Sequence, residues 1–313
     1  MKICMVGEGA FANKHLDAIA RIDGVEVASI CGGVREATDR VAQERGIPHA
    51  TQDLAEALSQ PDIEAAILAS PTPIHAEQAR QVMQAGKHVL VEIPMADNLA
   101  DAQSLVSLAE ETGRVAMVDH VRRFNPSHQW IHNRVVAGEL NIQQMDVQTY
   151  FFRRTNTNAR GEPRSWTDHL LWHHACHTVD LFQYQTDSPA AQVTALQGPV
   201  HPDLGIAMDM AIGMKSPRGA ICTLSLSFNN DGPFGTFFRY ICDQGTYVAN
   251  YDDLFTGAGE QIDVSGVAVS TDGIELADRE FFAAIREGRE PNSSLAQGLD
   301  AMVTLDRLER CLR

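Results

Sequence analysis

Residues 2–12 read KICMVGEGAFA, in which a short apolar run passes directly into a glycine-rich turn. Residues 7–12 of this stretch fit the pattern G-x-G-x-x-G/A. The pattern alone is weak evidence, but here it follows a predicted strand and begins a predicted helix at residues 10–22, the setting in which it marks dinucleotide binding. The stretch therefore predicts the first strand, turn and helix of a Rossmann fold.

Each small residue of this turn has a predicted task. Gly7 permits the tight turn, Gly9 lets the backbone approach a pyrophosphate, and Ala12 lets the helix pack closely on the sheet. Ala10 and Phe11 lie at the helix N-terminus, where the positive end of the helix dipole attracts phosphate. We therefore expect these five residues to bind the cofactor, and a glycine turn without a ligand is the weaker alternative.

The end of the second predicted strand bears on which dinucleotide binds. An NAD-binding Rossmann domain usually has an acid there, about twenty residues after the glycine motif, to bond the ribose 2′-hydroxyl. Here residues 30–35 read ICGGVR, without a carboxylate and with Arg35 just beyond the strand. An open loop with an arginine suits a 2′-phosphate, so we expect NADP as the cofactor, with NAD tolerated. Arg35 could equally be a solvated arginine at a helix start.

The chain has two halves with different patterns. Through residue 120, short apolar runs alternate with helical periodicity, which indicates a doubly wound parallel sheet and a dinucleotide-binding Rossmann domain over residues 1–120. Beyond it, strand-like runs joined by short turns lie between a few helical stretches. This pattern predicts a C-terminal α/β domain over residues 121–313, with an open, mostly antiparallel sheet for substrate binding and oligomerisation.

The composition narrows the possible partners and location. The net charge is −16, and such an acidic surface repels nucleic acid and anionic lipid. No apolar run approaches the length of a membrane span, and the first residues enter a strand without room for a signal peptide. The six cysteines are scattered without a CxxC pair, which favours reduced thiols in the cytoplasm and no structural metal.

A histidine cluster stands out in the second half. Residues 170–180 read LLWHHACHTVD, inside a predicted helix over residues 168–184. In a regular helix His173 and His177 share a face, and His174 points elsewhere. Histidine transfers protons near neutral pH and also ligates metals. We rank proton transfer first, hydrogen-bonded packing second and a zinc site third, and Cys176 offers a covalent alternative.

Longer motifs point to a known family. ASPTPIH at residues 69–75, VEIP at residues 91–94 and HVRRFNP at residues 120–126 occur in the order found in the glucose–fructose oxidoreductase / inositol dehydrogenase (Gfo/Idh/MocA) family, which the chain resembles over essentially its whole length. The resemblance implies an N-terminal Rossmann domain and a C-terminal sheet that contacts other subunits, hence a homodimer or homotetramer. It adds further cofactor-binding residues, namely Ser70, Thr72, His75, Glu92 and Pro94.

Two departures from the family change the expected substrate. Members typically have Glu-Lys-Pro where this chain has Glu92-Ile93-Pro94, and an aspartate where it has His173. The groups that grip a polyol are therefore missing. Further blocks in both halves resemble a branch that oxidises a small dicarboxylate aldehyde through its cyclic hemiacetal, a reaction that requires one general base.

The resemblance assigns one catalytic role, because His177 matches the family's catalytic histidine. His173, one helical turn earlier, could orient the substrate or share the proton, and Asp180, one turn later, could hold the tautomer of His177 or tie down the backbone. Arginine matches a carboxylate with two hydrogen bonds. The predicted substrate-binding residues are Arg122, Arg123, Arg153, Arg164, His173, His174 and Asn229. A dehydrogenase of a sugar acid and a dinucleotide-sensing regulator without turnover are the competing interpretations.

Overall fold

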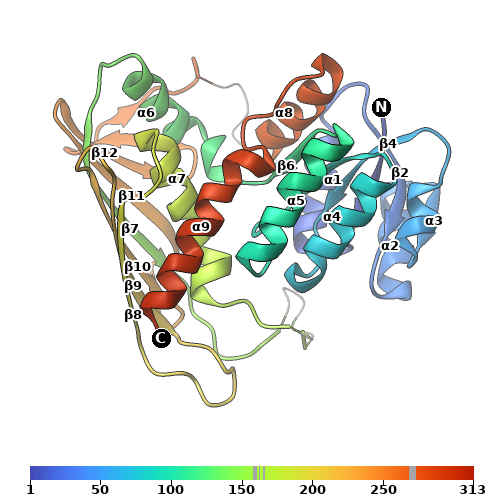
Figure 1. The fold of residues 1–313 in the computed structure, drawn as a ribbon, viewed down its shortest axis with the longest axis horizontal. Helices are drawn as coiled ribbons and strands as arrows, with labels where there is room; N and C mark the ends of the chain where they lie inside the picture. Colours follow the sequence, from blue (N-terminus) through green and yellow to red (C-terminus); the bar gives the residue numbers. More distant parts are fainter. Residues whose placement is uncertain (158–160, 162, 165, 268–272) are drawn as a thin grey trace. The chain divides into compact units, whose positions relative to one another are not determined.

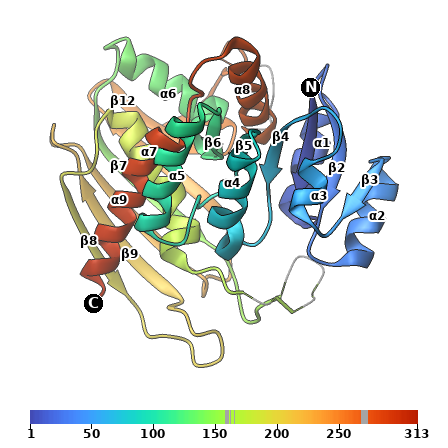
Figure 2. The same cartoon turned by 45° about the vertical axis from the view of Figure 1, so that its right-hand side comes forward.

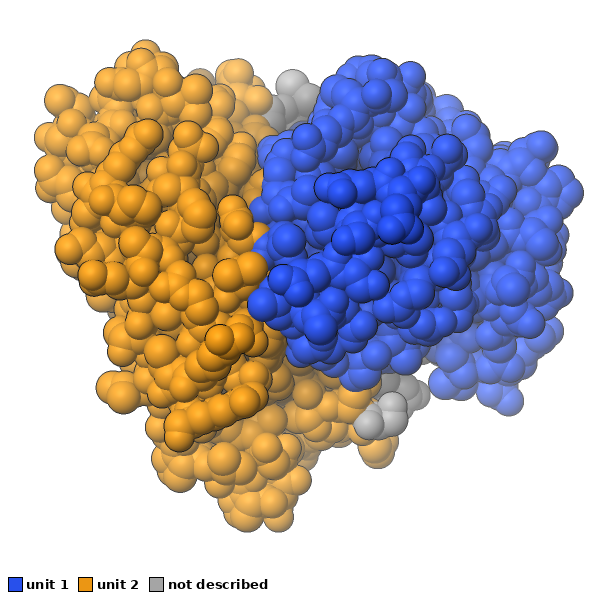
Figure 3. Space-filling view, in the orientation of Figure 1, with its two compact units in different colours: residues 1–120, 274–299 blue, residues 121–273, 300–313 orange. Residues whose placement is uncertain are grey.

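The computed structural model describes residues 1–157, 161, 163–164, 166–267 and 273–313. The chain divides into two compact units (Figure 3). Unit 1 comprises residues 1–120 and 274–299, and unit 2 comprises residues 121–273 and 300–313. The division of roles between residues 1–120 and 121–313 stays a prediction, and by contacts residues 274–299 group with the first of these segments.

Unit 1 is built on a six-stranded sheet in the order β3-β2-β1-β4-β5-β6, with every pairing parallel (Figures 1 and 2). Its strands are β1 (Lys2–Val6), β2 (Glu26–Cys31), β3 (His49–Thr51), β4 (Ile63–Leu68), β5 (His88–Val91) and β6 (Ala116–Val118). The central strands are apolar along their length because both faces are covered, as in other parallel sheets. The predicted Rossmann fold is confirmed.

Helices connect these strands. They are α1 (Ala10–Ile19), α2 (Arg35–Arg45), α3 (Leu54–Leu58), α4 (His75–Gln84) and α5 (Leu99–Thr112), with a 3₁₀ turn η1 (Thr72–Ile74) before α4 and α8 (Gly273–Glu287) near the end of the chain. Local sequence sets their ends. The side chains of Asp53 and Asn98 cap α3 and α5, and Gly46 and Gly113 end α2 and α5 in the left-handed conformation.

Unit 2 is built on an eight-stranded sheet in the order β14-β13-β12-β11-β7-β10-β9-β8. The β7–β10 pairing is parallel and the other pairings are antiparallel, which confirms the expected mostly antiparallel sheet. The strands are β7 (Ile142–Tyr150), β8 (Gln192–Gln197), β9 (Asp209–Lys215), β10 (Ile221–Ser227), β11 (Gly235–Cys242), β12 (Gly245–Asn250), β13 (Asp253–Thr256) and β14 (Gln261–Ile262).

The helices of unit 2 lie against one face of this sheet (Figure 1). They are α6 (Pro126–Val136), α7 (Cys176–Thr186) and the C-terminal part of α9 (Leu295–Cys311), with a short 3₁₀ turn η2 (Val121–Arg123). Strand β10 shows the consequence, because its side chains alternate between buried Cys222, Leu224 and Leu226 and exposed residues of the opposite face.

The structure differs from the predicted helix over residues 168–184. A π-helical turn, η3 (Leu170–Ala175), comes first, and the regular helix α7 begins only at Cys176. The prediction assumed uniform α-helical spacing, which does not hold from His173 to His177. The strand-like run over residues 142–154 forms a strand only as far as Tyr150, and beyond it Phe152 forms an isolated bridge to Asn229.

No helix among the described residues is both long enough and apolar enough to cross a membrane.

Gly7 makes a specific prediction about unit 1. Its φ is +119°, and a Cβ added there would lie 2.5 Å from the carbonyl oxygen of Ala69. Gly7→Ala should therefore destabilise the protein by at least about 1–3 kcal/mol from backbone strain alone, as measured by urea unfolding. Gly9→Ala is the matched control, because Gly9 has a negative φ and no atom within 4 Å of a Cβ. Equal stability of Gly7→Ala and the wild type would contradict the argument.

Candidate active site

The residues predicted to bind a dinucleotide gather at one edge of the sheet of unit 1. Gly7, Ser70 and Glu92 follow β1, β4 and β5, and the carboxyl ends of parallel strands share an edge. The strand order reverses between the neighbours β1 and β4, because β2 and β3 lie beyond β1 while β5 and β6 lie beyond β4. Such folds bind ligands at the point where the strand order reverses. The imidazole of His75 links the loops there, with Nδ1 2.9 Å from the Pro94 carbonyl oxygen and Nε2 2.8 Å from that of Ser70.

The glycine-rich turn fits a pyrophosphate. Gly9 precedes α1 with extended backbone and an open space where a Cβ would be, and no described side chain caps the helix. Ala10 and Phe11 are exposed at the start of α1, and Ala12 is fully buried against the sheet. The helix amides and the space above Gly9 are therefore suited to phosphate oxygens. Thr72, by contrast, is buried at the start of η1.

Arg35 and Glu8 meet at the loop after β2. Arg35 is the first residue of α2, and its Nε donates to Asp39 over 2.9 Å on the exposed surface. Glu8 reaches across from the glycine-rich turn and accepts hydrogen bonds from the backbone N–H groups of Gly33 and Val34. Glu8 is not singled out by sequence reasoning, because its partners lie 25 and 26 residues away.

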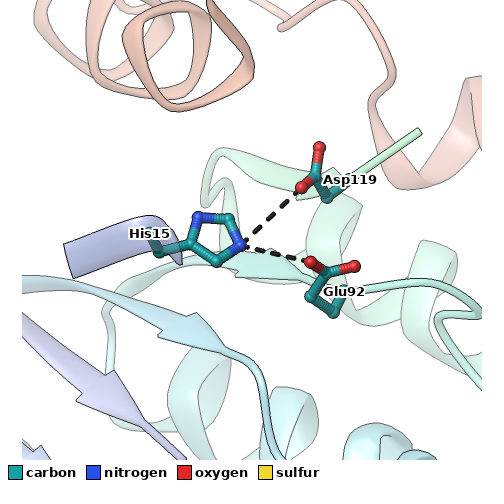
Figure 4. Close-up of side chains that lie close together, drawn as sticks. All are labelled: His15, Glu92 and Asp119. Atoms are coloured by element: carbon teal, nitrogen blue, oxygen red, sulfur yellow. Dashed lines mark hydrogen bonds and ion pairs between the residues drawn. The ribbon is translucent and has the colours of Figure 1, made fainter. Parts of the chain in front are cut away.

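A second feature that the sequence did not reveal is a buried ion-pair cluster around His15 (Figure 4). His15 Nδ1 lies 2.8 Å from Asp278 Oδ1, and Nε2 lies 3.3 Å from Glu92 Oε1 and 3.7 Å from Asp119 Oδ2. All four side chains are buried. Glu92, predicted to bind cofactor, is thus held by His15 and by the backbone N–H of Ile93.

This cluster favours a charged imidazole. Burial opposes the charge, but Asp278 and then Glu92 outweigh it and raise the pKa of His15 well above its ordinary value. The donor atoms of His15, Glu92 and Asp119 lie within 4.8 Å of one another, which a metal ion could also bridge. A metal requires a lone pair on the imidazole, whereas carboxylates at both ring nitrogens favour the imidazolium. We therefore interpret the cluster as an ion pair.

In unit 2, three predicted substrate-binding residues converge on one carboxylate. Arg153 donates two hydrogen bonds to Asp168, at 2.6 and 2.8 Å, and Arg164 donates a third at 2.7 Å. His174 Nε2 lies 3.1 Å from the same carboxylate. Burial raises the pKa of Asp168, but the hydrogen bonds of His174 and Arg153 outweigh it and hold that pKa far below its ordinary value. Asp168 was not predicted as a site residue.

His173 is held as a neutral imidazole. Its Nδ1 accepts a hydrogen bond of 3.1 Å from the backbone N–H of His169, so the remaining ring proton lies on Nε2. Burial, and then the neighbouring His169, lower its pKa to about 3. Its ring also packs near Trp166, at 5.5 Å between centroids. Near neutral pH, His173 therefore presents a hydrogen-bond donor and no charge.

Arg123 and Asp180 form a buried pair. Arg123 donates from Nε and Nη2 to the two carboxylate oxygens of Asp180, at 2.8 and 2.6 Å, and its guanidinium stacks over Tyr184. The pair joins η2 to α7, the helix that carries half-buried His177. Arg122 is also turned inward, donating to Asn125 and lying over the ring of Tyr251.

Two other predicted residues lie in hydrogen-bonded or packed surroundings. Asn229 donates to Asp209 and accepts from Arg154, a contact that ties the strand ends together. Cys176 is buried at the start of α7. Arg160, which lies between Arg153 and Arg164 in the sequence, is outside the described residues.

Comparisons with known proteins give the class. Residues 1–120 match the family described as "Oxidoreductase family, NAD-binding Rossmann fold", and residues 126–268 match "Bacterial oxidoreductases, C-terminal". The chain therefore belongs to the Gfo/Idh/MocA family of oxidoreductases, as the motifs predicted.

The relatives narrow this class. The chain is 64% identical over 309 residues, 99% of this chain and 98% of the relative, to the 4-carboxy-2-hydroxymuconate-6-semialdehyde dehydrogenase of Sphingobium sp. (strain NBRC 103272 / SYK-6). It is 25% identical over 258 residues, 80% of this chain and 72% of the relative, to an inositol 2-dehydrogenase of Mycolicibacterium smegmatis. Its fold matches levoglucosan dehydrogenase in complex with NADH and levoglucosan, with a TM-score of 0.86, 19% identity and coverage of 99% and 97%.

The His15 cluster predicts a pH-dependent stability. Because the folded pKa is raised, the stabilisation is complete below the unfolded pKa of about 6.5 and is lost as the pH rises through the folded pKa. His15→Gln should lower the free energy of unfolding by about 3–5 kcal/mol at pH 6.5, with a smaller difference at higher pH. Urea unfolding from pH 6.5 to 9 measures this.

His88 provides the control for that measurement. Burial and then Arg114 lower its pKa, so His88 is neutral in both the folded and the unfolded state above about pH 6.5–7, and the stability difference between the wild type and His88→Gln should stay nearly constant up to pH 9. A His15→Gln difference that is constant across the range would contradict a charged His15.

Proposed function

We propose that this oxidoreductase converts the cyclic hemiacetal of 4-carboxy-2-hydroxymuconate-6-semialdehyde to 2-pyrone-4,6-dicarboxylate, in the 4,5-cleavage route of protocatechuate breakdown. The observation that carries the proposal is the 64% identity to a dehydrogenase of that substrate over 98% of its length. We further propose NADP as the preferred hydride acceptor, with NAD tolerated, and a location in the cytoplasm, which six scattered cysteines without a CxxC pair support.

The chemistry requires one base and no covalent intermediate. The 2-hydroxyl of the substrate adds to its own aldehyde, which places a hydroxyl and a hydrogen on the same carbon. A nicotinamide cofactor, when bound, would supply the acceptor for that hydrogen as hydride. The protein removes the hydroxyl proton, the C–O bond becomes a carbonyl, and the product is the lactone. Proton transfer by a positioned side chain contributes about 10²–10⁴-fold.

We assign the removal of that hydroxyl proton to His177. It lies half-buried in the first turn of α7, and the Arg123–Asp180 pair fixes this helix one turn further on. This contact supports a positioning role for Asp180 and Arg123. His173 is suited to orient the hemiacetal, because a neutral imidazole with its proton on Nε2 donates to an oxygen without competing for the proton.

The arginines around Asp168 supply the attraction for a dianionic substrate. Arg153 and Arg164 share one carboxylate, so the group keeps a net positive charge. Asp168 orients both guanidiniums, and the N–H groups that bond to no described residue are suited to a substrate carboxylate. Arg122, His174 and Asn229 complete the proposed substrate-binding set, and their contacts with protein groups fit a supporting role.

The assay that tests this proposal follows absorbance of reduced nicotinamide with NADP and freshly ring-cleaved protocatechuate. Wild type should turn over, His177→Ala should lose at least about 10²-fold in kcat, and Cys176→Ala should keep most activity because a buried thiol is a poor nucleophile. Near-normal turnover of His177→Ala would overturn the base assignment. Wild type inactive with either dinucleotide would favour a sensing regulator, and turnover of sugar acids alone would favour the other enzymatic interpretation.

We also propose a homodimer, or a homotetramer, assembled through the exposed face of the unit 2 sheet. On β10 this face carries Ile221, Thr223 and Ser225. Ile221 is a large exposed apolar side chain beside two small polar ones, which is unusual for a surface in contact with water. Sedimentation velocity should show a dimer or tetramer for the wild type and a shift toward monomer for Ile221→Arg. A monomeric wild type would refute the assembly.

A further inference from the structure

Glu8 lies between the two glycines of the turn and is half-buried. Both of its carboxylate oxygens accept from the backbone N–H of Gly33, each at 3.1 Å, and Oε1 also accepts from the N–H of Val34 at 3.0 Å. These two amides follow β2 and directly precede α2. A side chain of the phosphate-binding turn thus occupies the loop that faces the adenosine ribose in Rossmann domains.

The loop is built around this carboxylate. A Cβ on Gly32 would lie 2.8 Å from Glu8 Oε2 and would also collide with the hydroxyl of Thr38, so a side chain at this position would displace Glu8 or Thr38. Gln52 donates to the carbonyl oxygen of Gly33 over 3.0 Å, and Thr38 donates to that of Val34 over 2.9 Å. These bonds hold the loop so that its N–H groups point at an anion.

The 2′-phosphate of NADP would compete with the Glu8 carboxylate for these two backbone N–H groups. Two backbone N–H groups at the start of a helix suit the 2′-phosphate of NADP, which needs the same donors. The one arginine at this helix start, Arg35, is paired with Asp39. Negative charge gathers nearby, since burial and then the carboxylates of Asp53, Glu8 and Glu56 raise the pKa of Cys31. A 2′-phosphate that binds here is therefore repelled by the Glu8 carboxylate, which already accepts hydrogen bonds from the N–H groups that the phosphate would use.

We propose that Glu8 is a specificity-determining residue for the dinucleotide, occupying the 2′-phosphate site and accepting the ribose hydroxyls when NAD binds. Glu8 thereby takes over the task of the acid that is absent from the end of β2. NAD is tolerated for this reason, and the proposed preference for NADP is narrower than it would be without this carboxylate. The inference rests on the proposed use of both dinucleotides.

The test is binding without turnover. Glu8→Gln keeps the size and an oxygen acceptor but removes the charge. Isothermal titration should give a Kd for 2′,5′-ADP that falls by about tenfold or more, as expected for relief of one close charge repulsion, while the Kd for 5′-AMP stays the same or rises. Fluorescence titration with NADPH and NADH should show the same change in the ratio of the two Kd values.

Glu36→Gln is the matched control. Glu36 is an exposed acid in the first turn of the same helix and carries the same charge, so the change removes one charge from this end of α2 without touching the amides of Gly33 or Val34. An unchanged ratio in Glu8→Gln, or an equal change in Glu36→Gln, would overturn the role of Glu8 and leave the proposed reaction standing. A wild type that binds neither dinucleotide would overturn both.

Discussion

Unit 1 depends on a single buried cation. The imidazolium of His15, in the middle of α1, contacts carboxylates that follow β5 and β6 and a third on α8. These carboxylates could not be buried together without it, because mutual repulsion in a low-dielectric interior is strong. The helix that begins at the glycine-rich turn is thereby fixed to the loop of Glu92, so the two halves of the nucleotide-binding edge keep one geometry.

In unit 2 the charges are reversed, because one carboxylate lies among several cationic groups. There a single carboxylate, Asp168, collects two guanidiniums and an imidazole, and leaves a positive surplus in a chain whose net charge is −16. Without Asp168 the two arginines would repel each other and adopt many conformations. A shared counter-ion makes them a rigid pair, and rigidity lowers the entropic cost of holding a substrate carboxylate.

The fold and the family could be read from local patterns, whereas the supporting contacts could not. The glycine turn and the alternation of strands and helices are local signals, and both units have the predicted sheets. Glu8, His15 and Asp168 escaped because an isolated acid or histidine looks solvated until its partners are known, and Asp278 lies 263 residues from His15. The histidine helix was misread for a different reason, since no residue pattern announces a π turn.

That π turn allows the positions of His173 and His177 to change separately, whereas a continuous α-helix would move them together. A π turn holds about one residue more than an α turn, so η3 can absorb a single-residue change of length while α7 keeps its packing. Shortening it would rotate everything before Cys176 and leave His177 in place. The orientation of the side chain at position 173 can therefore change, in evolution or in design, without moving the proposed base.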